Sequence, residues 1–308
     1  MKPLWILCLI ALCGSPRMAA CVCPAAPVAW APDVSPYFLC VGPSGNVYVT
    51  NGDVAHTVTV HAPGGAVLAT WSAPAGAGGA FMPEGIAVDA AGIVYVSDIQ
   101  NSRIVVLDAG GQYLRSLSNP GTGAGQFLLP FDLALGPDND LFVVEAMPGS
   151  GKIVHLRRDG TFLNEWPVVT NNNAYDIAVD GDGTVYGSQW PGETPVEVYS
   201  SGGALLRTWA PGSAGETVST ARLEAAEGRV FVSIARIATG GPYTELRTFD
   251  GFGAQQCVVG VPFLGAIAFD PGGHLYAGAP DQHEVFRLAI DPTPALKLSW
   301  GALKQRYR

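Results

Sequence analysis

Charged residues, histidine and cysteine are all scarce in this chain, and each shortage excludes a class of protein. Of 308 residues only 14% are charged, with 26 Asp and Glu against 17 Lys and Arg. A net charge of -9 leaves no basic surface for RNA or DNA, so we expect no nucleic-acid partner. The 6 cysteines are too scattered for a disulfide framework, and the 5 histidines do not recur at any repeated position. A zinc or histidine-based site is therefore disfavoured.

Long apolar runs are also missing, whereas turn-forming residues abound. The chain contains 39 Gly and 24 Pro, and both residue types break helices, which argues against a helical bundle. Its content of aromatic and β-branched residues is too high for a disordered chain. The apolar run Leu4–Leu12 is too short to cross a membrane, so no transmembrane segment is expected. The composition predicts an acidic, turn-rich β protein.

The first 20 residues have the pattern of a secretory signal. Lys2 supplies the positive charge, Leu4–Leu12 the apolar run, and Met18–Ala20 a cleavage site of small residues. We therefore expect residues 1–20 to be a signal peptide and the protein to be exported, to the periplasm or the extracellular space. Cys21 follows directly, so a lipid anchor on this cysteine is the alternative to a cleaved, soluble product.

One unit of about 45 residues occurs six times along the chain. An aromatic residue inside a short apolar strand marks each copy, and these marker aromatics are Tyr48, Tyr95, Phe142, Tyr186, Phe231 and Tyr276. Each copy has four short strands separated by turn residues, which is typical of a propeller blade. The sequence thus predicts an all-β, six-bladed β-propeller over residues 21–292, followed by a short basic tail at 293–308.

The fourth strand of the sixth blade has two candidate sources. Pro27–Pro32 resembles Arg207–Pro211 in the fourth blade, and Leu296–Trp300 fits the same pattern. A strand taken from the other end of the chain pins the ring shut, so we expect the N-terminal segment to close it.

The second copy also carries a recognisable motif. Ala75–Asp89, Tyr95–Asp98 and Asn101–Ile104 closely resemble an NHL repeat, and Gly121–Phe127 followed by Pro130 repeats its opening. The resemblance fades to the bare strand pattern in the fifth and sixth copies. It implies an NHL-type six-bladed propeller, a fold that serves binding platforms, sensor domains and enzymes, so it does not name a function.

Polar residues follow the marker aromatic by three positions in the first four copies, whereas the last two copies are apolar there. We expect these four side chains at the mouth of the axial channel as ligand-binding candidates: Asn51, Asp98, Glu145 and Gln189. Asp98 has a structural alternative, because with Asn101 and Arg103 it would tie its own loop together. Trp190 and Arg236, the latter in a long loop at 236–243, are candidate anchors for a partner.

Three carboxylates stand where the inner strands are expected to begin. Asp132 and Asp176 occupy a position at which NHL repeats usually have Gly, and Glu84 lies one residue earlier in the second copy. Carboxylates that converge on one channel repel each other unless a cation or a proton joins them, and Ca²⁺ prefers such ligands. A calcium site is therefore one interpretation, and a wide, hydrated acidic funnel is the other.

Two functional hypotheses follow. No GxSxG elbow, no phosphate-binding glycine motif and no complete catalytic set is present. The first hypothesis is thus a monomeric, exported propeller that acts as a binding or scaffold module for a protein, peptide or glycan ligand at its axial mouth. The alternative is a metal-dependent enzyme of the lactonase or lyase type, in which Glu84, Asp132 and Asp176 hold a cation that polarises a carbonyl.

Overall fold

The computed structural model of the chain describes the part that forms the ring. The described residues are 27–32, 35–52, 54–118, 120–169, 174–189, 195–212, 216, 218–226, 228–238, 241–261, 265–270 and 272–289, with backbone alone at 118, 219–221, 236–238 and 241–243. The expected signal peptide, Cys21, Trp190 and the basic tail lie outside these ranges. Within the ranges, no helix is long and apolar enough to cross a membrane.

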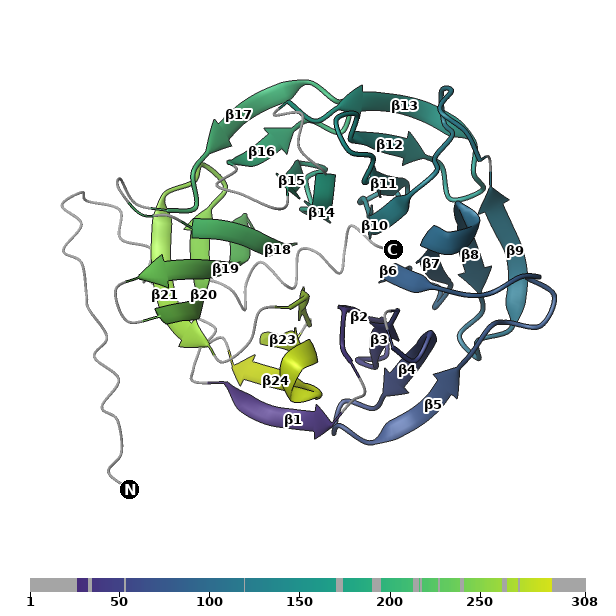
Figure 1. Cartoon of the computed structure of the whole chain (residues 1–308), viewed down its shortest axis with the longest axis horizontal. Coiled ribbons are helices and arrows are strands. Elements are labelled where there is room, and N and C mark those ends of the chain that lie inside the picture. Colours follow the sequence, from purple (N-terminus) through teal and green to yellow (C-terminus); the bar gives the residue numbers. More distant parts are fainter. Residues whose placement is uncertain are drawn as a thin grey trace.

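Six four-stranded antiparallel sheets are arranged in a ring, as Figure 1 shows. Blade one consists of β2 (Phe38–Val41), β3 (Val47–Asn51), β4 (Thr57–His61) and β5 (Val67–Trp71). Blade two consists of β6 (Pro83–Val88), β7 (Val94–Asp98), β8 (Arg103–Leu107) and β9 (Tyr113–Ser118). Blade three consists of β10 (Pro130–Leu135), β11 (Leu141–Glu145), β12 (Lys152–Leu156) and β13 (Phe162–Pro167). The first strand of each blade is the innermost one, so the predicted strand order is confirmed.

The second half of the ring repeats this order. Blade four consists of β14 (Ala174–Val179), β15 (Val185–Gln189), β16 (Val196–Tyr199) and β17 (Leu205–Trp209). Blade five consists of β18 (Val218–Ala226), β19 (Arg229–Ala238), β20 (Gly241–Asp250) and β21 (Gln255–Val261). Blade six consists of β22 (Ile267–Phe269), β23 (His274–Ala279), β24 (Glu284–Ala289) and β1 (Val28–Pro32). Two single-turn 3-10 helices, η1 (Ile99–Asn101) and η2 (Pro280–Gln282), complete the described elements.

The N-terminal strand closes the ring, as the sequence predicts. β1 pairs antiparallel with β24, beside which it lies in Figure 1. Trp30 of this strand packs against Tyr276 at 4.8 Å between ring centroids, and its Nε1 donates to the carbonyl of Pro63 in blade one. This strand therefore contacts both the last blade and the first. The competing segment 296–300 lies outside the described residues.

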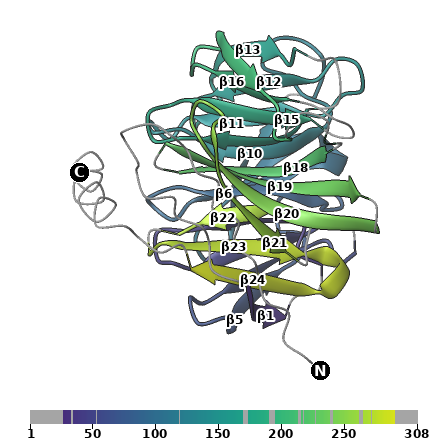
Figure 2. The same ribbon diagram turned by 90° about the vertical axis from the view of Figure 1, so that its left-hand side faces the viewer.

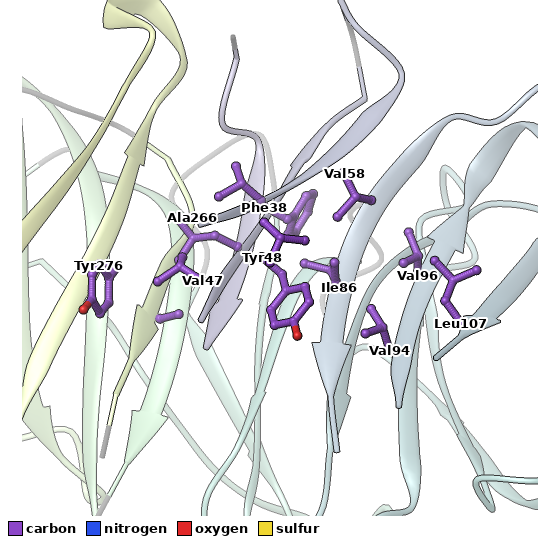
Figure 3. Packing of buried hydrophobic residues seen from close by; sticks show 14 of the residues in the cluster. Phe38, Val47, Tyr48, Val58, Ile86, Val94, Val96, Leu107, Ala266 and Tyr276 are labelled. Atoms are coloured by element: carbon purple, nitrogen blue, oxygen red, sulfur yellow. The ribbon is translucent and has the colours of Figure 1, made fainter. Parts of the chain in front are cut away.

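Each blade packs on the next through apolar side chains from its two faces. Figure 3 shows one such cluster, in which Tyr276 and Ala266 of blade six, Phe38 and Val47 of blade one and Ile86 of blade two lie together. All six marker aromatics are buried in such clusters, because the alternation of the strands turns them toward the neighbouring blade. Burial of apolar side chains is the main favourable contribution to the fold, at about 25 cal/mol per Å².

Tryptophans of the outer strands pack on glycine turns of the following blade. A Cβ at Gly111 would lie 2.5 Å from the Trp71 ring, and one at Gly203 would lie 2.6 Å from the Trp166 ring. Both glycines also have positive φ, +82° and +86°, so glycine suits them for two reasons. The glycine-rich turns of the repeat therefore carry packing between blades.

Blade five differs from the others in length. β19 and β20 have 10 residues each, and their pairing continues to Ala238 and Gly241. Figure 2 shows these two strands in edge-on view, running past the strands of neighbouring blades. The expected long loop at 236–243 is therefore wrong: the hydrogen-bonded ladder continues through Arg236, which pairs with Tyr243.

Candidate functional site

A cavity of about 270 Å³ follows the axis and is lined by the inner strands of all six blades. Most of the residues that line it are of apolar types. Three carboxyl side chains and one thiol also line it: Asp132, Asp176, Glu224 and Cys40. We call the end of the channel at which the inner strands begin the mouth. Asp132 and Asp176 lie near this end, and Glu224 lies further along its strand.

The strands that carry Asp132 and Asp176 are irregular at these residues. The register of β10 shifts between Pro130 and Leu133, and that of β14 shifts between Ala174 and Asp176. A β-bulge re-aims side chains, and bulges are common beside functional sites. The bulges set the direction in which the two carboxylates leave their strands.

Each of these carboxylates reaches the inner strand of the next blade. Asp132 Oδ2 accepts the N–H of Ile177 at 2.9 Å, and Asp176 Oδ1 accepts the N–H of Leu223 at 3.1 Å. The inner strands of blades three, four and five are thereby joined around the axis. In blade two the same position is Gly85, where a Cβ would lie 2.6 Å from the Asp132 Cα. Glycine is required there because the Asp132 backbone approaches so closely.

Arg222 supplies a cation that pairs with Asp176. It follows a register shift in β18, its side chain is buried, and its Nη1 lies 3.3 Å from Asp176 Oδ2. The guanidinium carbon lies over four aromatic rings, 3.8 Å from the centroid of Phe38, 4.4 Å from Tyr175, 5.1 Å from Tyr37 and 5.9 Å from Phe131. Such contacts stabilise a buried cation through the negative faces of the rings.

Three of these rings are partly exposed, namely Tyr37, Phe131 and Tyr175, and we call them the aromatic rim. Phe131 contacts Tyr175 at 4.9 Å and Tyr37 at 6.5 Å between centroids. Burial, followed by the neighbouring Tyr175, raises the pKa of Tyr37. The rim is thus contributed by blades one, three and four, with the guanidinium of blade five against it.

The carboxyl groups of the channel hold protons more tightly than exposed ones do. Burial, followed by the nearby charge of Asp176, raises the pKa of Asp132 well above its ordinary value. Burial raises the pKa of Asp176 to about 6, although Arg222 and the Leu223 N–H oppose this. Burial and then the charge of Asp176 raise the pKa of Glu224 to about 8. Near neutral pH, Glu224 is therefore a proton donor in an apolar wall.

The three carboxylates expected to hold calcium, Glu84, Asp132 and Asp176, do not form one cluster in the described part of the chain. Glu84 is buried, and its carboxylate faces blade one, where a Cβ on Gly52 would lie 2.9 Å from Oε1. In the described part of the chain, which includes Glu84, Asp132 and Asp176, no group of three His, Cys, Asp or Glu side chains is placed to hold a metal ion. The predicted three-carboxylate cluster is therefore not formed. A guanidinium and raised pKa values relieve the repulsion between Asp132 and Asp176 instead.

The four polar residues after the marker aromatics contact protein groups of their own blades. Asn51 Oδ1 accepts the N–H of Ser35, and Asp98 Oδ1 accepts that of Met82. Glu145 accepts the N–H groups of residues 128 and 129, and Gln189 donates to Glu197 Oε1. In blades one to three this position therefore holds the loop that leads into the blade. A ligand-binding role for these residues stays a prediction.

The contacts of Asp98 match the structural alternative, in which Asp98, Asn101 and Arg103 tie their own loop together. Arg103 Nε and Asn101 Nδ2 both donate to Asp98 Oδ2 at 2.8 Å, and Arg103 also donates to the carbonyl of Gly78. This network ties the glycine-rich loop before blade two to the end of β7.

The remaining candidates are only partly described. Trp190 lies outside the described residues, and Arg236 is described as backbone within β19. The expectation that no histidine position repeats is wrong for His56 and His283, which have φ of 52° and 54°, as Ser102 has at 53°, and so share one left-handed turn position. These two histidines therefore lie where the turn needs a residue with a left-handed backbone conformation.

Arg222, Glu224 and the aromatic rim were not among the sequence candidates. One signal could have found Glu224: seven residues before the marker aromatic, the other five copies have Val41, Val88, Leu135, Val179 and Phe269. All six residues line the cavity, so one acid stands in an otherwise apolar ring. For Arg222 the pattern gave no signal, because a bulge shifts the register at that point.

Fold and site together define a six-bladed β-propeller with a polar, aromatic axial mouth, and solved structures of that class resemble it. A gluconolactonase from Xanthomonas campestris matches with a TM-score of 0.64 and 18% identity, over 84% of this chain and 88% of that one. Virginiamycin B lyase from Staphylococcus aureus matches with a TM-score of 0.57 and 13% identity, over 84% and 96%. A streptogramin B lyase matches with a TM-score of 0.55 and 15% identity, over 84% and 95%. At such identities the likeness shows the fold alone.

No protein-family model matches the chain. The NHL repeat therefore stays a resemblance of the second and third copies.

Proposed function

We propose that this protein is a binding module that holds its ligand at the axial mouth, against the aromatic rim. The observation that carries the proposal is the rim itself: three partly exposed rings from three blades, backed by a buried guanidinium. Exposed aromatic side chains and arginine are the residue types that most often dominate binding energy. The rings are pre-positioned by their mutual contacts, which lowers the entropy lost on binding.

The ligand classes that suit such a surface are a glycan, a peptide or a protein segment that inserts a planar or apolar group. Sugar rings and aromatic side chains both stack on tyrosine and phenylalanine faces. The experiment is a binding screen of glycan and peptide arrays with purified protein, followed by the Tyr175→Ala variant. We expect this variant to fold and to lose at least about tenfold in affinity for any ligand found.

Phe162→Ala is the matched control, because Phe162 is an aromatic residue on the outer strand β13 and is 40% exposed. We expect this variant to bind as the unchanged protein does. A ligand that Tyr175→Ala and Phe162→Ala bind equally well would place the binding surface elsewhere and overturn the proposal.

An acid–base enzyme is the second candidate, favoured by the raised pKa of Glu224 inside the channel. The gluconolactonase and lyase propellers that share the fold are compatible with this candidate. Glu224 would donate a proton to a leaving oxygen, and the Arg222 N–H groups would polarise a carbonyl. The test is hydrolysis of gluconolactone by the unchanged protein and by Glu224→Gln. Turnover that the variant loses supports the enzyme, whereas equal rates, or no turnover, count against it.

We also propose export to the periplasm or the extracellular space, as a monomer. The disulfide-bonded state of Cys257 supports export, because disulfides persist in oxidising compartments. Cell fractionation, size-exclusion chromatography and the intact mass of the mature protein test the proposal. A mass that ends at Cys21 with added acyl groups would show a lipid anchor, and a mass that retains residues 1–20 would contradict cleavage.

A further inference from the structure

A second cavity, of about 370 Å³, shares no lining residue with the axial one. It lies between the loop that leads into blade three and the ends of β11, β12 and β13, and we call it the blade-three pocket. Its lining includes Thr122, Glu145, Met147, Lys152 and Trp166. Pockets for small ligands usually have about 300–1,000 Å³. The blade-three pocket is therefore large enough for a small molecule or for one side chain of a partner.

Glu145, in the wall of this pocket, is a buried carboxylate without an ion pair. It is 2% exposed, and burial raises its pKa. Its Oε1 accepts the N–H groups of Leu128 and Leu129, whereas its Oε2 accepts only the Leu128 N–H, which both oxygens share. No Lys or Arg side chain of the described residues pairs with it, and Lys152 Nζ instead lies 2.9 Å from Glu165 Oε2. Since a carboxylate oxygen can accept two hydrogen bonds, Oε2 can take a further donor.

Blade two shows which group satisfies the equivalent carboxylate. Asp98 stands at the position of Glu145, and Arg103, its partner across the two strands, stands at the position of Lys152. Arg103 Nε donates to Asp98 Oδ2 at 2.8 Å, and its other two nitrogens donate to carbonyls of the loop that leads into blade two. Lys152 reaches the corresponding loop with a contact of 3.4 Å to the carbonyl of Gly123. In blade two a guanidinium thus pairs with the carboxylate, whereas in blade three a cavity lies beside it.

Trp166 adds a hydrogen-bond donor and an aromatic ring to the lining. It is 6% exposed, and its Nε1 has no acceptor in the described part of the chain. Trp209, at the same position of blade four, also lacks an acceptor, but of the two tryptophans it is Trp166 that lines this cavity. Buried donors are nearly always paired, and indole rings attract cations. A ligand that carries both a cation and a carbonyl oxygen therefore suits the wall.

We propose that the blade-three pocket binds a guanidinium group, such as that of an arginine side chain, whose N–H groups donate to Glu145 while its remaining atoms pack against Met147 and Trp166. The charges match, because Glu145 and Glu165 against Lys152 leave one negative charge in the lining. A guanidinium can also reach several acceptors at once, which an ammonium group does less well. The site is separate from the aromatic rim, so it goes beyond the proposed function. The guanidinium can belong to a free small molecule or to a peptide segment.

N-acetylarginine amide and N-acetylcitrulline amide are matched probes, because they have the same length and differ in the charge of the end group. We expect calorimetric titration to show millimolar or tighter binding of the arginine probe and at least about tenfold weaker binding of the citrulline probe. Propylguanidinium, which has no carbonyl, separates the two sources. Binding equal to that of the arginine probe supports a free small molecule, and weaker binding supports a peptide segment.

Three variants locate the site. Glu145→Gln should weaken binding of the arginine probe by about tenfold or more, because the charge that pairs with the guanidinium is removed. Ser150→Phe changes an exposed residue of the lining, and its ring should weaken binding by narrowing the pocket. Asp281→Asn removes the same charge at an exposed position of blade six, so this control should bind as the unchanged protein does.

The comparison of the two matched probes needs only the unchanged protein, so it decides even if Glu145→Gln fails to fold. Equal binding of the arginine and citrulline probes, or no binding of the arginine probe at millimolar concentration, would overturn the proposal. Unchanged affinity of both Glu145→Gln and Ser150→Phe for the arginine probe would overturn it as well. None of these results bears on the aromatic rim, which Tyr175→Ala tests with its own ligands.

Discussion

The two halves of the ring place different side chains at the same backbone positions along the axis. Blades six, one and two, which we call the apolar arc, present Ala266, Phe38 and Gly85 at the mouth. Blades three to five, the polar arc, present Asp132, Asp176 and Arg222 there. The strands of both arcs are otherwise alike in order and pairing. The departures from the repeat are therefore concentrated where chemistry can occur, since the fold itself needs only small or apolar residues at these positions.

The largest effect is expected from removing the cation of the polar arc. Arg222→Met should lower the free energy of unfolding by about 3–5 kcal/mol, because Asp176 is left as an uncompensated buried charge. Chemical denaturation measures this change. Ile86→Val, one residue further along the inner strand than the equivalent position Gly85 of the apolar arc, should cost only about 0.5–1.5 kcal/mol.

A double variant makes this prediction sharper. Arg222→Met combined with Asp176→Leu should recover most of the lost stability, because no buried charge remains. If the double variant is as unstable as Arg222→Met alone, packing against the rings, and not the charge, is the role of Arg222.

The second largest loss of stability is expected at Gly85, where blade two of the apolar arc touches blade three of the polar arc. Gly85→Ala should destabilise by about 1–3 kcal/mol, because overpacking forces the backbone apart. The new Cβ would lie 2.6 Å from the Asp132 Cα and 2.7 Å from its Oδ1. Gly64→Ala is the control, since a Cβ there meets nothing within 4 Å. Equal denaturation midpoints for the two variants would contradict the close approach of blades two and three.

A third prediction uses the pH dependence of the polar arc. Glu224 has a pKa raised from 4.5 to about 8, so the folded state binds its proton more tightly than the unfolded state does. Its stabilising contribution is complete below about pH 4.5 and is lost as the pH rises through about 8. Glu224→Gln should therefore raise the melting temperature by a few degrees above pH 8 and have little effect near pH 5.

Calorimetry of Glu224→Gln and of the unchanged protein at both pH values checks this. Parallel melting curves across the range would show that Glu224 titrates normally. Val88→Thr in blade two, at the same position of the apolar arc, should change stability equally at both pH values, because it adds no titrating group.

The smallest effect is expected at the polar position that both arcs share. Asn51→Ala should cost about 1 kcal/mol, because the Ser35 N–H and the Thr59 hydroxyl lose their partner. Denaturation measures this cost, and binding of an array ligand should stay unchanged. A variant with normal stability and lost binding would instead restore Asn51 as a ligand-binding residue.

Sequence reasoning succeeded for features that repeat and failed for those that depend on one blade meeting another. The marker aromatics and the strand order could be read from spacing alone, and the closing strand from its likeness to Arg207–Pro211. Asp132 and Asp176 were singled out because they depart from the pattern. Arg222, the partner of Asp176, was not foreseen, because it follows Asp176 by 46 positions and sits at a bulge. No local pattern connects residues so far apart.

The sequence by itself determined the architecture, because a period of about 45 residues with four strands per unit can bury its apolar faces only by stacking in a ring. Small residues near the axis and a strand that closes the ring follow from that requirement. Only the tertiary structure decided what the mouth contains. Ring closure brings Tyr37, Phe131, Tyr175 and Arg222 together from four blades. The raised pKa values of the carboxyls arise from the same burial, which no single repeat can produce.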